Sequence, residues 1–121
     1  MSSIDDASEV EALLPLSPPV YHVLLGLGGE TLHGYAIMQA FEELTGGAER
    51  LLPGPLYATL ARMLETGLIE EAAPTHEGAD ARRRYYRLTS KGRRVAAAES
   101  ERMRRLLEVA VAQRVAPGAT G

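Results

Sequence analysis

Residues 82–94 read Arg-Arg-Arg-Tyr-Tyr-Arg-Leu-Thr-Ser-Lys-Gly-Arg-Arg, a stretch with seven basic residues and no acidic one. The chain as a whole is acidic, with 13 Lys+Arg against 16 Asp+Glu. The two signs are segregated, because residues 1–52 contain eight acidic residues and only one basic residue, Arg50. A phosphate backbone responds to the local potential, so a basic segment of this kind indicates nucleic-acid binding. The alternative is an ordinary solvated face rich in arginine.

The same stretch also predicts strand structure. Residues 68–73 and 82–88 are predicted to be two short strands, and the polar segment 74–81, which contains Pro and Gly, is predicted to be the turn between them. Alternation along the second strand places Arg84, Tyr86 and Leu88 on one face, toward the core. The opposite face then carries Arg83, Tyr85 and Arg87.

Three short helices are predicted before this hairpin, each bounded by a capping residue or proline at its start and by glycine at its end. The first begins at Ser17-Pro18 and ends at Gly28-Gly29, the second is capped by Thr31 and ends at Gly46-Gly47, and the third opens at Gly54-Pro55 and ends at Gly67. Short helices with tight connections predict a helix-turn-helix, and a hairpin directly after it predicts a wing.

A long helix is predicted from the cap at Thr89 to about Val115, where proline and glycine follow. At ~1.5 Å per residue it is on the order of 40 Å long. Five apolar residues form one stripe at helical spacing: Met103, Leu106, Leu107, Ala110 and Val111. A domain this small cannot cover the stripe, so we expect it to be a homodimer interface. The alternative is a helix folded back on its own core.

The expected fold is therefore mainly α with a small β-hairpin, a winged helix-turn-helix followed by a long C-terminal dimerisation helix. We divide the chain into an acidic N-terminal arm with mobile first residues (1–16), a DNA-binding domain (17–88), the dimerisation helix (89–116) and a disordered tail (117–121).

The composition narrows the function classes. The 121 residues are 45% hydrophobic, which indicates a folded chain, and they include no cysteine and three histidines without ligand-like spacing. No nucleophile–base pair and no phosphate-cradling glycine loop is present, so neither an enzyme nor a cofactor or metal site is predicted. There is no signal-peptide pattern and no apolar run long enough to span a membrane, which predicts a cytoplasmic protein.

The third predicted helix has a distinct outer face. At 100° per residue, Leu56, Leu60 and Met63 define the buried side, and Thr59 projects near it. Arg62 on the outer side is placed to contact a guanine edge or a phosphate, and Ala58 a thymine methyl. Gly54 leaves the amides at the helix start free to meet a phosphate. The residues of this helix predicted to bind DNA are Gly54, Pro55, Tyr57, Ala58, Ala61 and Arg62, all but Pro55 on its outer side.

Further DNA contacts are predicted from the wing and the second helix. Arg82 and Arg83 lie nearest the hairpin tip and suit a phosphate or a minor groove, and Tyr35 lies where a helix-turn-helix crosses the DNA backbone. We expect His33 to pack the second helix and Gly34 to permit close helix approach. For Tyr57 a backbone contact and packing under the wing are both open, and for Arg62 the alternative is a solvated surface arginine.

Several motifs in order resemble the PadR family of bacterial transcriptional regulators, over about residues 20–107. The matching segments are Leu32-His33-Gly34-Tyr35-Ala36-Ile37, Pro53-Gly54-Pro55-Leu56-Tyr57, Leu60 with Arg62, Gly67-Leu68-Ile69, Arg83-Arg84-Tyr85-Tyr86-Arg87-Leu88-Thr89 and Gly92-Arg93. The resemblance implies a winged helix-turn-helix dimer with an exchanged C-terminal helix. It also implies repression at an inverted-repeat operator in double-stranded DNA, relieved by a small molecule.

The chain departs from this family pattern at three points. Pro55 stands where the family often has Thr, Leu64 replaces a usually acidic residue, and the dimer helix has no aromatic residue. Some relatives are thought to hold planar effectors between aromatic side chains, and nothing in this helix supports that mechanism. A small apolar effector would have to be bound by Met103, Leu106, Leu107 and the N-terminal residues. The competing function is a winged-helix protein–protein module without DNA binding.

Overall fold

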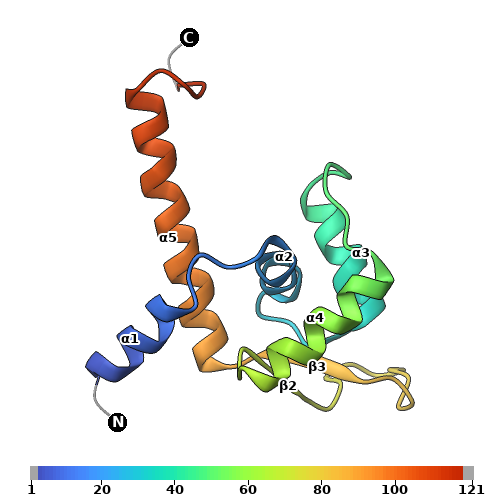
Figure 1. Ribbon diagram of the computed structural model, residues 1–121. Helices are drawn as coiled ribbons and strands as arrows, with labels where there is room; N and C mark the ends of the chain where they lie inside the picture. Colours follow the sequence, from blue (N-terminus) through green and yellow to red (C-terminus); the bar gives the residue numbers. More distant parts are fainter. Residues whose placement is uncertain (1–2, 119–121) are drawn as a thin grey trace.

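The computed structural model describes residues 3–118, and it is mostly helical (56%) with a small antiparallel sheet (Figure 1). Within those residues five helices and three strands follow one another along the chain. They are α1 (Ser3–Ala12), α2 (Pro18–Leu27), β1 (Leu32–His33), α3 (Gly34–Leu44), α4 (Pro53–Glu65), β2 (Ile69–Glu71), β3 (Tyr85–Leu88) and α5 (Ser90–Ala112).

The helix-turn-helix is made by α2, α3 and α4. The helices α2 and α4 begin at a proline, and α3 begins after a residue whose side chain caps it. α2 begins at Pro18 as predicted, although the Ser17 side chain makes no capping hydrogen bond. The predicted cap of α3 at Thr31 is wrong: His33 is the N-cap, and its Nδ1 accepts from the Ala36 amide at 3.1 Å. The helix starts later because residues 32–33 are extended and pair with β3.

The helix α4 begins at Pro53, two residues before the start predicted at the Gly54 cap and Pro55. The N-cap, Leu52, has no side-chain acceptor, so proline at the first helical position sets the start. The helix ends after Glu65, and Gly67 follows with φ 76°, a left-handed conformation that glycine adopts without a Cβ penalty.

The sheet has the order β1-β3-β2, so the predicted hairpin of β2 and β3 gains a third strand. In its register Leu32 pairs with Tyr86, and Ile69 pairs with Leu88. Both hairpin strands are shorter than the predicted 68–73 and 82–88, because the connecting loop extends over residues 72–84.

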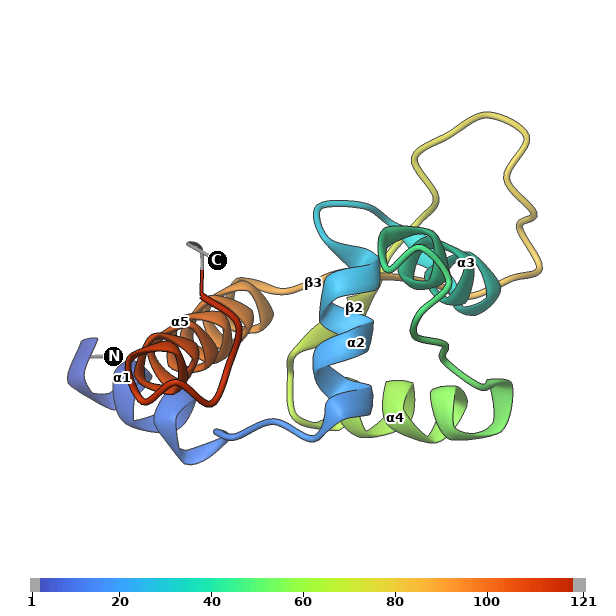
Figure 2. The same ribbon diagram turned by 90° about the horizontal axis from the view of Figure 1, so that it is seen from above.

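The N-terminal segment, which the sequence predicted to be an acidic arm, contains a helix. Residues from Ser3 onward form α1, which packs against α5 beside Val10, a buried residue (Figures 1 and 2). The main-chain N–H of Leu16 donates to the fully buried carboxylate of Glu99 at 2.8 Å. Residues 1–2 lie outside the described residues, as do residues 119–121 of the predicted disordered tail.

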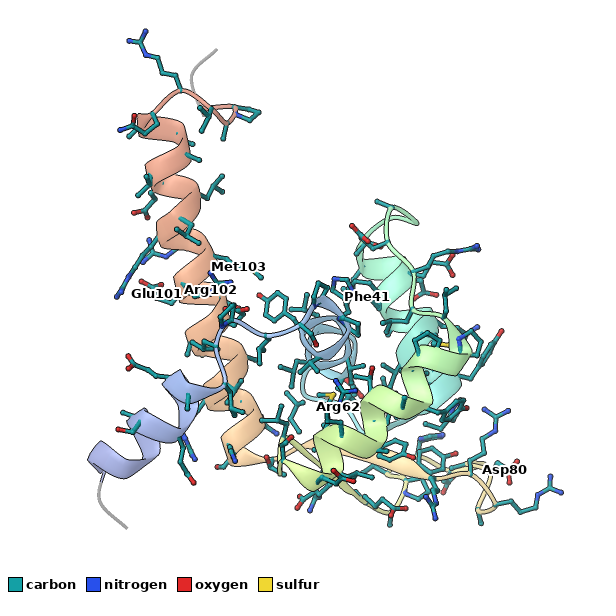
Figure 3. All side chains as sticks on the ribbon, in the orientation of Figure 1. Phe41, Arg62, Asp80, Glu101, Arg102 and Met103 are labelled. Carbon is teal, nitrogen blue, oxygen red and sulfur yellow. The ribbon has the colours of Figure 1, made fainter. Side chains whose placement is uncertain are left out.

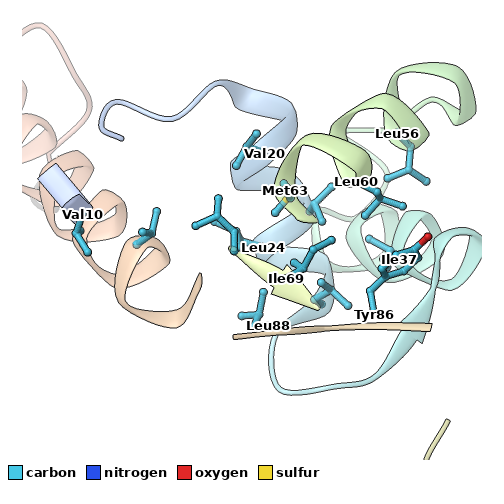
Figure 4. Packing of buried hydrophobic residues seen from close by; sticks show 14 residues of the cluster. Val10, Val20, Leu24, Ile37, Leu56, Leu60, Met63, Ile69, Tyr86 and Leu88 are labelled. Atoms are coloured by element: carbon cyan, nitrogen blue, oxygen red, sulfur yellow. The ribbon is translucent and has the colours of Figure 1, made fainter. Parts of the chain in front are cut away.

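The long helix α5 is capped by Thr89 as predicted, since the Gly92 amide donates to Thr89 Oγ1 at 3.0 Å. It ends at Ala112, before the predicted Val115. α5 and α1 lie at one end of the molecule and the loop of the wing lies at the other (Figure 2). Between them a hydrophobic core joins α2, α4 and the sheet, and it includes Leu24, Leu60 and Ile69 (Figure 4).

Candidate nucleic-acid interface

The outer face of α4 is the one that the sequence predicted. Leu56, Thr59, Leu60 and Met63 are buried, so the helix is oriented by its apolar side against α2 and α3. All six residues of this helix that were predicted to bind DNA are exposed: Gly54, Pro55, Tyr57, Ala58, Ala61 and Arg62. Figure 3 shows Arg62 on this helix. A face with small residues at positions 58 and 61 and an arginine beside them can approach the edge of a base pair.

The start of α4 has fewer free N–H groups for a phosphate than the sequence predicted. Proline has no N–H, so among the first three residues of the helix only Gly54 carries a donor. A Cβ added at Gly54 would meet no atom within 4 Å. The fold itself therefore has no need of glycine at this position, and the open space suits a close approach by a ligand.

A hollow of about 500 Å³ lies where the start of α3, the middle of α4 and the wing meet. Three of the predicted DNA-binding residues, Tyr35, Tyr57 and Arg83, come together here. The remaining lining residues are His33, Gly34, Arg84 and Tyr86. Tyrosine hydroxyls and guanidinium groups are donors that bind phosphate oxygens, so the hollow has the chemistry of a backbone-phosphate site.

Gly34 explains the position of Tyr57. A Cβ at Gly34 would lie 3.2 Å from the Tyr57 ring, so glycine lets the ring lie across the start of α3. This confirms the close approach that was predicted for Gly34. Tyr57 remains 57% exposed. The ring and hydroxyl of Tyr57 therefore lie against the start of α3, while more than half of the residue stays at the surface.

His33 joins α3 to the wing. Its Nδ1 accepts from the Ala36 amide, and Nη1 of Arg83 lies 2.9 Å from His33 Nε2. The Tyr85 ring stands edge-on to it, with ring centroids 5.4 Å apart. Partial burial, followed by the nearby Arg83 charge, lowers the pKa of His33. A neutral His33 with its lone pair on Nδ1 accepts from the Ala36 amide and so caps α3. Arg83 Nη1 lies 3.0 Å from the same nitrogen and can share this acceptor.

Tyr85 corrects the predicted strand faces. Alternation placed it outward with Arg83 and Arg87, yet it is buried. The wing loop folds over it: the Tyr85 hydroxyl accepts from the Asp80 amide at 3.1 Å, and the His76 ring lies edge-on at 6.1 Å. Tyr86 is buried on the core side as predicted, and burial raises its pKa.

Four wing arginines are paired with acids of the same chain. The Nε atoms lie at 3.3 Å (Arg82–Asp80), 3.9 Å (Arg83–Asp80), 3.6 Å (Arg84–Glu71) and 2.8 Å (Arg87–Glu70). Exposed pairs of this kind are weak and can be exchanged for phosphate. Among the arginine side chains that the structure describes, Arg62, Arg93, Arg94 and Arg114 have no such partner.

Arg84 is a residue that sequence reasoning missed. The period-2 pattern placed it on the core face with Tyr86, and it was therefore not counted among the DNA-binding residues. It is exposed at the end of the wing loop, just before β3, and it lines the hollow beside Tyr35 and Tyr57. The signal was present in the run of three arginines at 82–84, whose members cannot all point into a core.

The predicted dimer stripe is uncovered within this chain. Met103, Leu106, Leu107 and Val111 are exposed and Ala110 is half-buried, with Leu106 56% and Leu107 57% exposed. The second half of α5 stands clear of the rest of the fold (Figure 1), so the helix is not folded back on its own core. Leu106, a member of the stripe, also lines a hollow of about 650 Å³ between α1 and α5, together with Leu14.

Residues 3–118 contain neither a metal-ligand cluster nor a membrane-spanning helix. No three His, Cys, Asp or Glu side chains there are arranged to hold a metal ion. No helix of residues 3–118 combines the length and apolarity that crossing a membrane requires.

Comparison with known proteins identifies the family of this chain. Residues 23–98 match the model of the transcriptional regulator PadR-like family. An uncharacterized 37.1 kDa protein in transposon Tn4556 of Streptomyces fradiae is 40% identical over 84 residues, which is 69% of this chain and 22% of that protein. This chain thus spans about a fifth of the length of that relative.

Solved structures share the fold. A PadR family transcription regulator from Clostridium difficile has a TM-score of 0.63 at 24% identity, covering 78% of this chain and 95% of that one. H. salinarum RosR has a TM-score of 0.59 at 27% identity, covering 84% and 96%. Bacillus subtilis PadR in complex with operator DNA has a TM-score of 0.57 at 25% identity, covering 69% and 47%. The chain belongs to the PadR-like family of transcriptional regulators, and its fold is the winged helix-turn-helix.

Proposed function

We propose that this protein is a transcriptional repressor that binds an inverted-repeat operator as a homodimer and is released by a small apolar effector. The observation that carries the DNA-binding part is the hollow in which Tyr35, Tyr57 and Arg83 meet. These residues come from three separate elements, and all three present donors at one surface. The solved complex of Bacillus subtilis PadR with operator DNA supports the same use of this fold here.

Within this proposal the residues divide into two groups. Arg62 on the outer face of α4 reads a base edge in the major groove, flanked by Ala58 and Ala61. Tyr35, Tyr57, Arg82 and Arg83, with the Gly54 amide, bind backbone phosphates and orient the helix. The newly found Arg84 joins the second group.

The homodimer is supported by the uncovered stripe on α5. Two copies that pair through Leu106 and Leu107 would remove both side chains from water, which is favourable by ~25 cal/mol per Å² of apolar surface. A dimer with twofold symmetry places two identical DNA-binding domains on one duplex, and an inverted repeat supplies two identical half-sites.

The effector is supported by the hollow between α1 and α5. Leu14, Ala98 and Leu106 give it an apolar wall that borders the dimer stripe, and the charged residues Glu11, Glu101, Arg102 and Arg105 line the rest. A molecule bound there would contact both α5, the proposed dimer helix, and α1, which packs against it. A change in the angle between α1 and α5 would alter the distance between the two DNA-binding domains of the dimer, and this would lower the affinity for DNA.

The experiment is a selection of duplexes from a randomised library by the purified protein. We expect enrichment of an inverted repeat. Repeating it with Arg62→Ala should relax the preference at one base position of each half-site, whereas Arg83→Ala should weaken binding to all sequences about equally. If the protein enriches no sequence and binds no duplex, the proposal fails, and a winged-helix module that binds other proteins becomes the better account.

A further inference from the structure

The wing turn is organised around one acidic residue, Asp80. Its Oδ1 accepts from the Arg82 amide at 2.9 Å, a local pattern by which aspartate fixes a turn. Its carbonyl oxygen accepts from the Arg83 amide at 3.1 Å. Its own amide donates to the Tyr85 hydroxyl at 3.1 Å, which ties the turn to the buried ring. Asp80 is therefore held on both sides and sets the backbone from which two arginines project.

The Asp80 carboxylate also contacts the side chains of these arginines. Arg82 Nε and Nη2 lie 3.3 and 3.5 Å from its oxygens, and Arg83 Nε lies 3.9 Å away. The hydrogen bonds from the Arg82 amide and side chain hold the pKa of Asp80 below its ordinary value, so the group is ionised at neutral pH. One negative charge thus lies between Arg82 and Arg83, two cations of the proposed DNA-binding surface.

Arg83 is restrained from a second direction by His33, whose ring nitrogens lie 2.9 and 3.0 Å from Nη1. The guanidinium is thus held between the start of α3 and the wing turn, at the edge of the hollow that Tyr35 and Tyr57 line. A side chain held in place before binding loses less conformational entropy when a phosphate arrives. In the free protein Arg83 thus contacts both Asp80 and His33.

We propose that Asp80 is a positioning and specificity-determining residue of the DNA-binding surface: it aims Arg82 and Arg83, and its charge weakens binding to any duplex that does not place a phosphate in the hollow. The proposal rests on the DNA-binding function proposed above. Its two effects have opposite signs. Fixing the turn favours the correctly registered complex, whereas a carboxylate near DNA repels every phosphate backbone.

The wing loop supplies a matched control. Glu77 lies in the same loop, is exposed, and makes no ion pair or hydrogen bond among the described residues. Glu77→Gln changes the net charge as much as Asp80→Asn does, but it leaves the arginines where they are. Asp80→Asn keeps an acceptor for the Arg82 amide and removes only the charge, whereas Asp80→Ala removes both.

The test measures affinities of the full chain for a selected operator and for a random duplex by fluorescence anisotropy, with thermal unfolding as a check on each variant. Asp80→Asn should bind the random duplex roughly tenfold more tightly, with two wings per dimer each gaining a few-fold. Its operator-to-random ratio should fall. Asp80→Ala should bind the operator more weakly than Asp80→Asn does, although the two carry the same charge.

The outcomes separate the proposals. If Asp80→Asn behaves like Glu77→Gln, the effect is one of net charge alone and Asp80 has no special role. If Asp80→Asn and Asp80→Ala bind the operator equally, the turn does not position the arginines. Either result overturns the inference while the unsubstituted protein still binds its operator. If the unsubstituted protein binds no DNA, the proposed function fails, and this inference fails with it.

Discussion

Gly92 lies directly on the main chain of Leu68: a Cβ at position 92 would overlap the Leu68 carbonyl oxygen and lie 3.0 Å from its carbon. The same junction is bonded on both sides. Thr89 Oγ1 donates to the Gly67 carbonyl, and Lys91 Nζ donates to the Thr66 carbonyl at 2.9 Å. The turn that ends α4 is therefore joined directly to the start of α5.

Gly92→Ala should destabilise the fold by about 2 kcal/mol or more, because the neighbouring atoms are backbone and cannot rotate away. Thermal unfolding measures this as a lower midpoint. Gly29→Ala is the control, since a Cβ there would meet nothing within 4 Å. A Gly92→Ala protein as stable as the Gly29→Ala protein would show that the junction is looser than the structure has it.

Gly54→Ala should leave stability unchanged or slightly raised, because alanine favours helices and the added Cβ has open space. DNA affinity should nevertheless fall several-fold, since the Cβ would stand between the helix start and a phosphate. Parallel unfolding and DNA-binding measurements separate the two effects. Unchanged DNA affinity would remove Gly54 from the interface.

The double substitution of Leu106 and Leu107 by Glu should dissociate the proposed dimer, because it puts charge into an apolar interface at a cost of several kcal/mol. Sedimentation measures the mass. Leu44→Glu is the control: Leu44 is also exposed but lies on α3, away from the stripe. A double mutant that keeps the dimer mass would place the interface elsewhere.

Glu99 predicts a loss of stability in acid. Hydrogen bonds from Arg102 and from the Leu16 amide hold its pKa below the ordinary value, although its burial opposes this. The carboxylate therefore adds stability above the ordinary pKa of about 4.3. That contribution is lost as the pH falls from there through the lower folded-state pKa.

Glu99→Gln is the test of this contribution. It should cost ~1–3 kcal/mol at neutral pH, and the difference from the unsubstituted protein should shrink below about pH 4.3. Asp80 and Glu101, whose pKa values are also lowered by neighbouring arginines, titrate in both proteins and cancel in the comparison. A difference that stays constant from neutral pH to acid would contradict the role given to the Glu99 charge.

The sequence predicted those features that depend on local chemistry. The proline start of α2, the Thr89 cap and the outer face of α4 follow from backbone geometry and helical spacing, and the structure has all three. The helix α4 also starts at a proline, but at Pro53 and not at the predicted Pro55. The same holds for the buried Tyr86, because Leu88 faces the core and residues two apart on a strand share a face.

Features that depend on distant contacts were out of its reach. β1 has only two residues, too few for a readable period, and it exists because β3 lies beside it. α1 is acidic and short, and packing on α5 stabilises it. Tyr85 is buried by a loop that folds over it. The pairing of Arg84 with Glu71 likewise joins residues on opposite sides of the hairpin loop.

The central claim, a symmetric dimer that reads two half-sites with α4 and the wing, is tested most directly by operator spacing. Twofold symmetry requires half-sites about one helical turn, roughly 10 base pairs, apart. The measurement is the affinity of the full chain for duplexes that carry the selected half-sites at the native spacing and with about half a turn, roughly 5 base pairs, inserted. We expect the insertion to reduce binding to the level of a single half-site, because the second half-site then lies on the opposite side of the duplex from its DNA-binding domain. Equal affinity at both spacings would contradict the account.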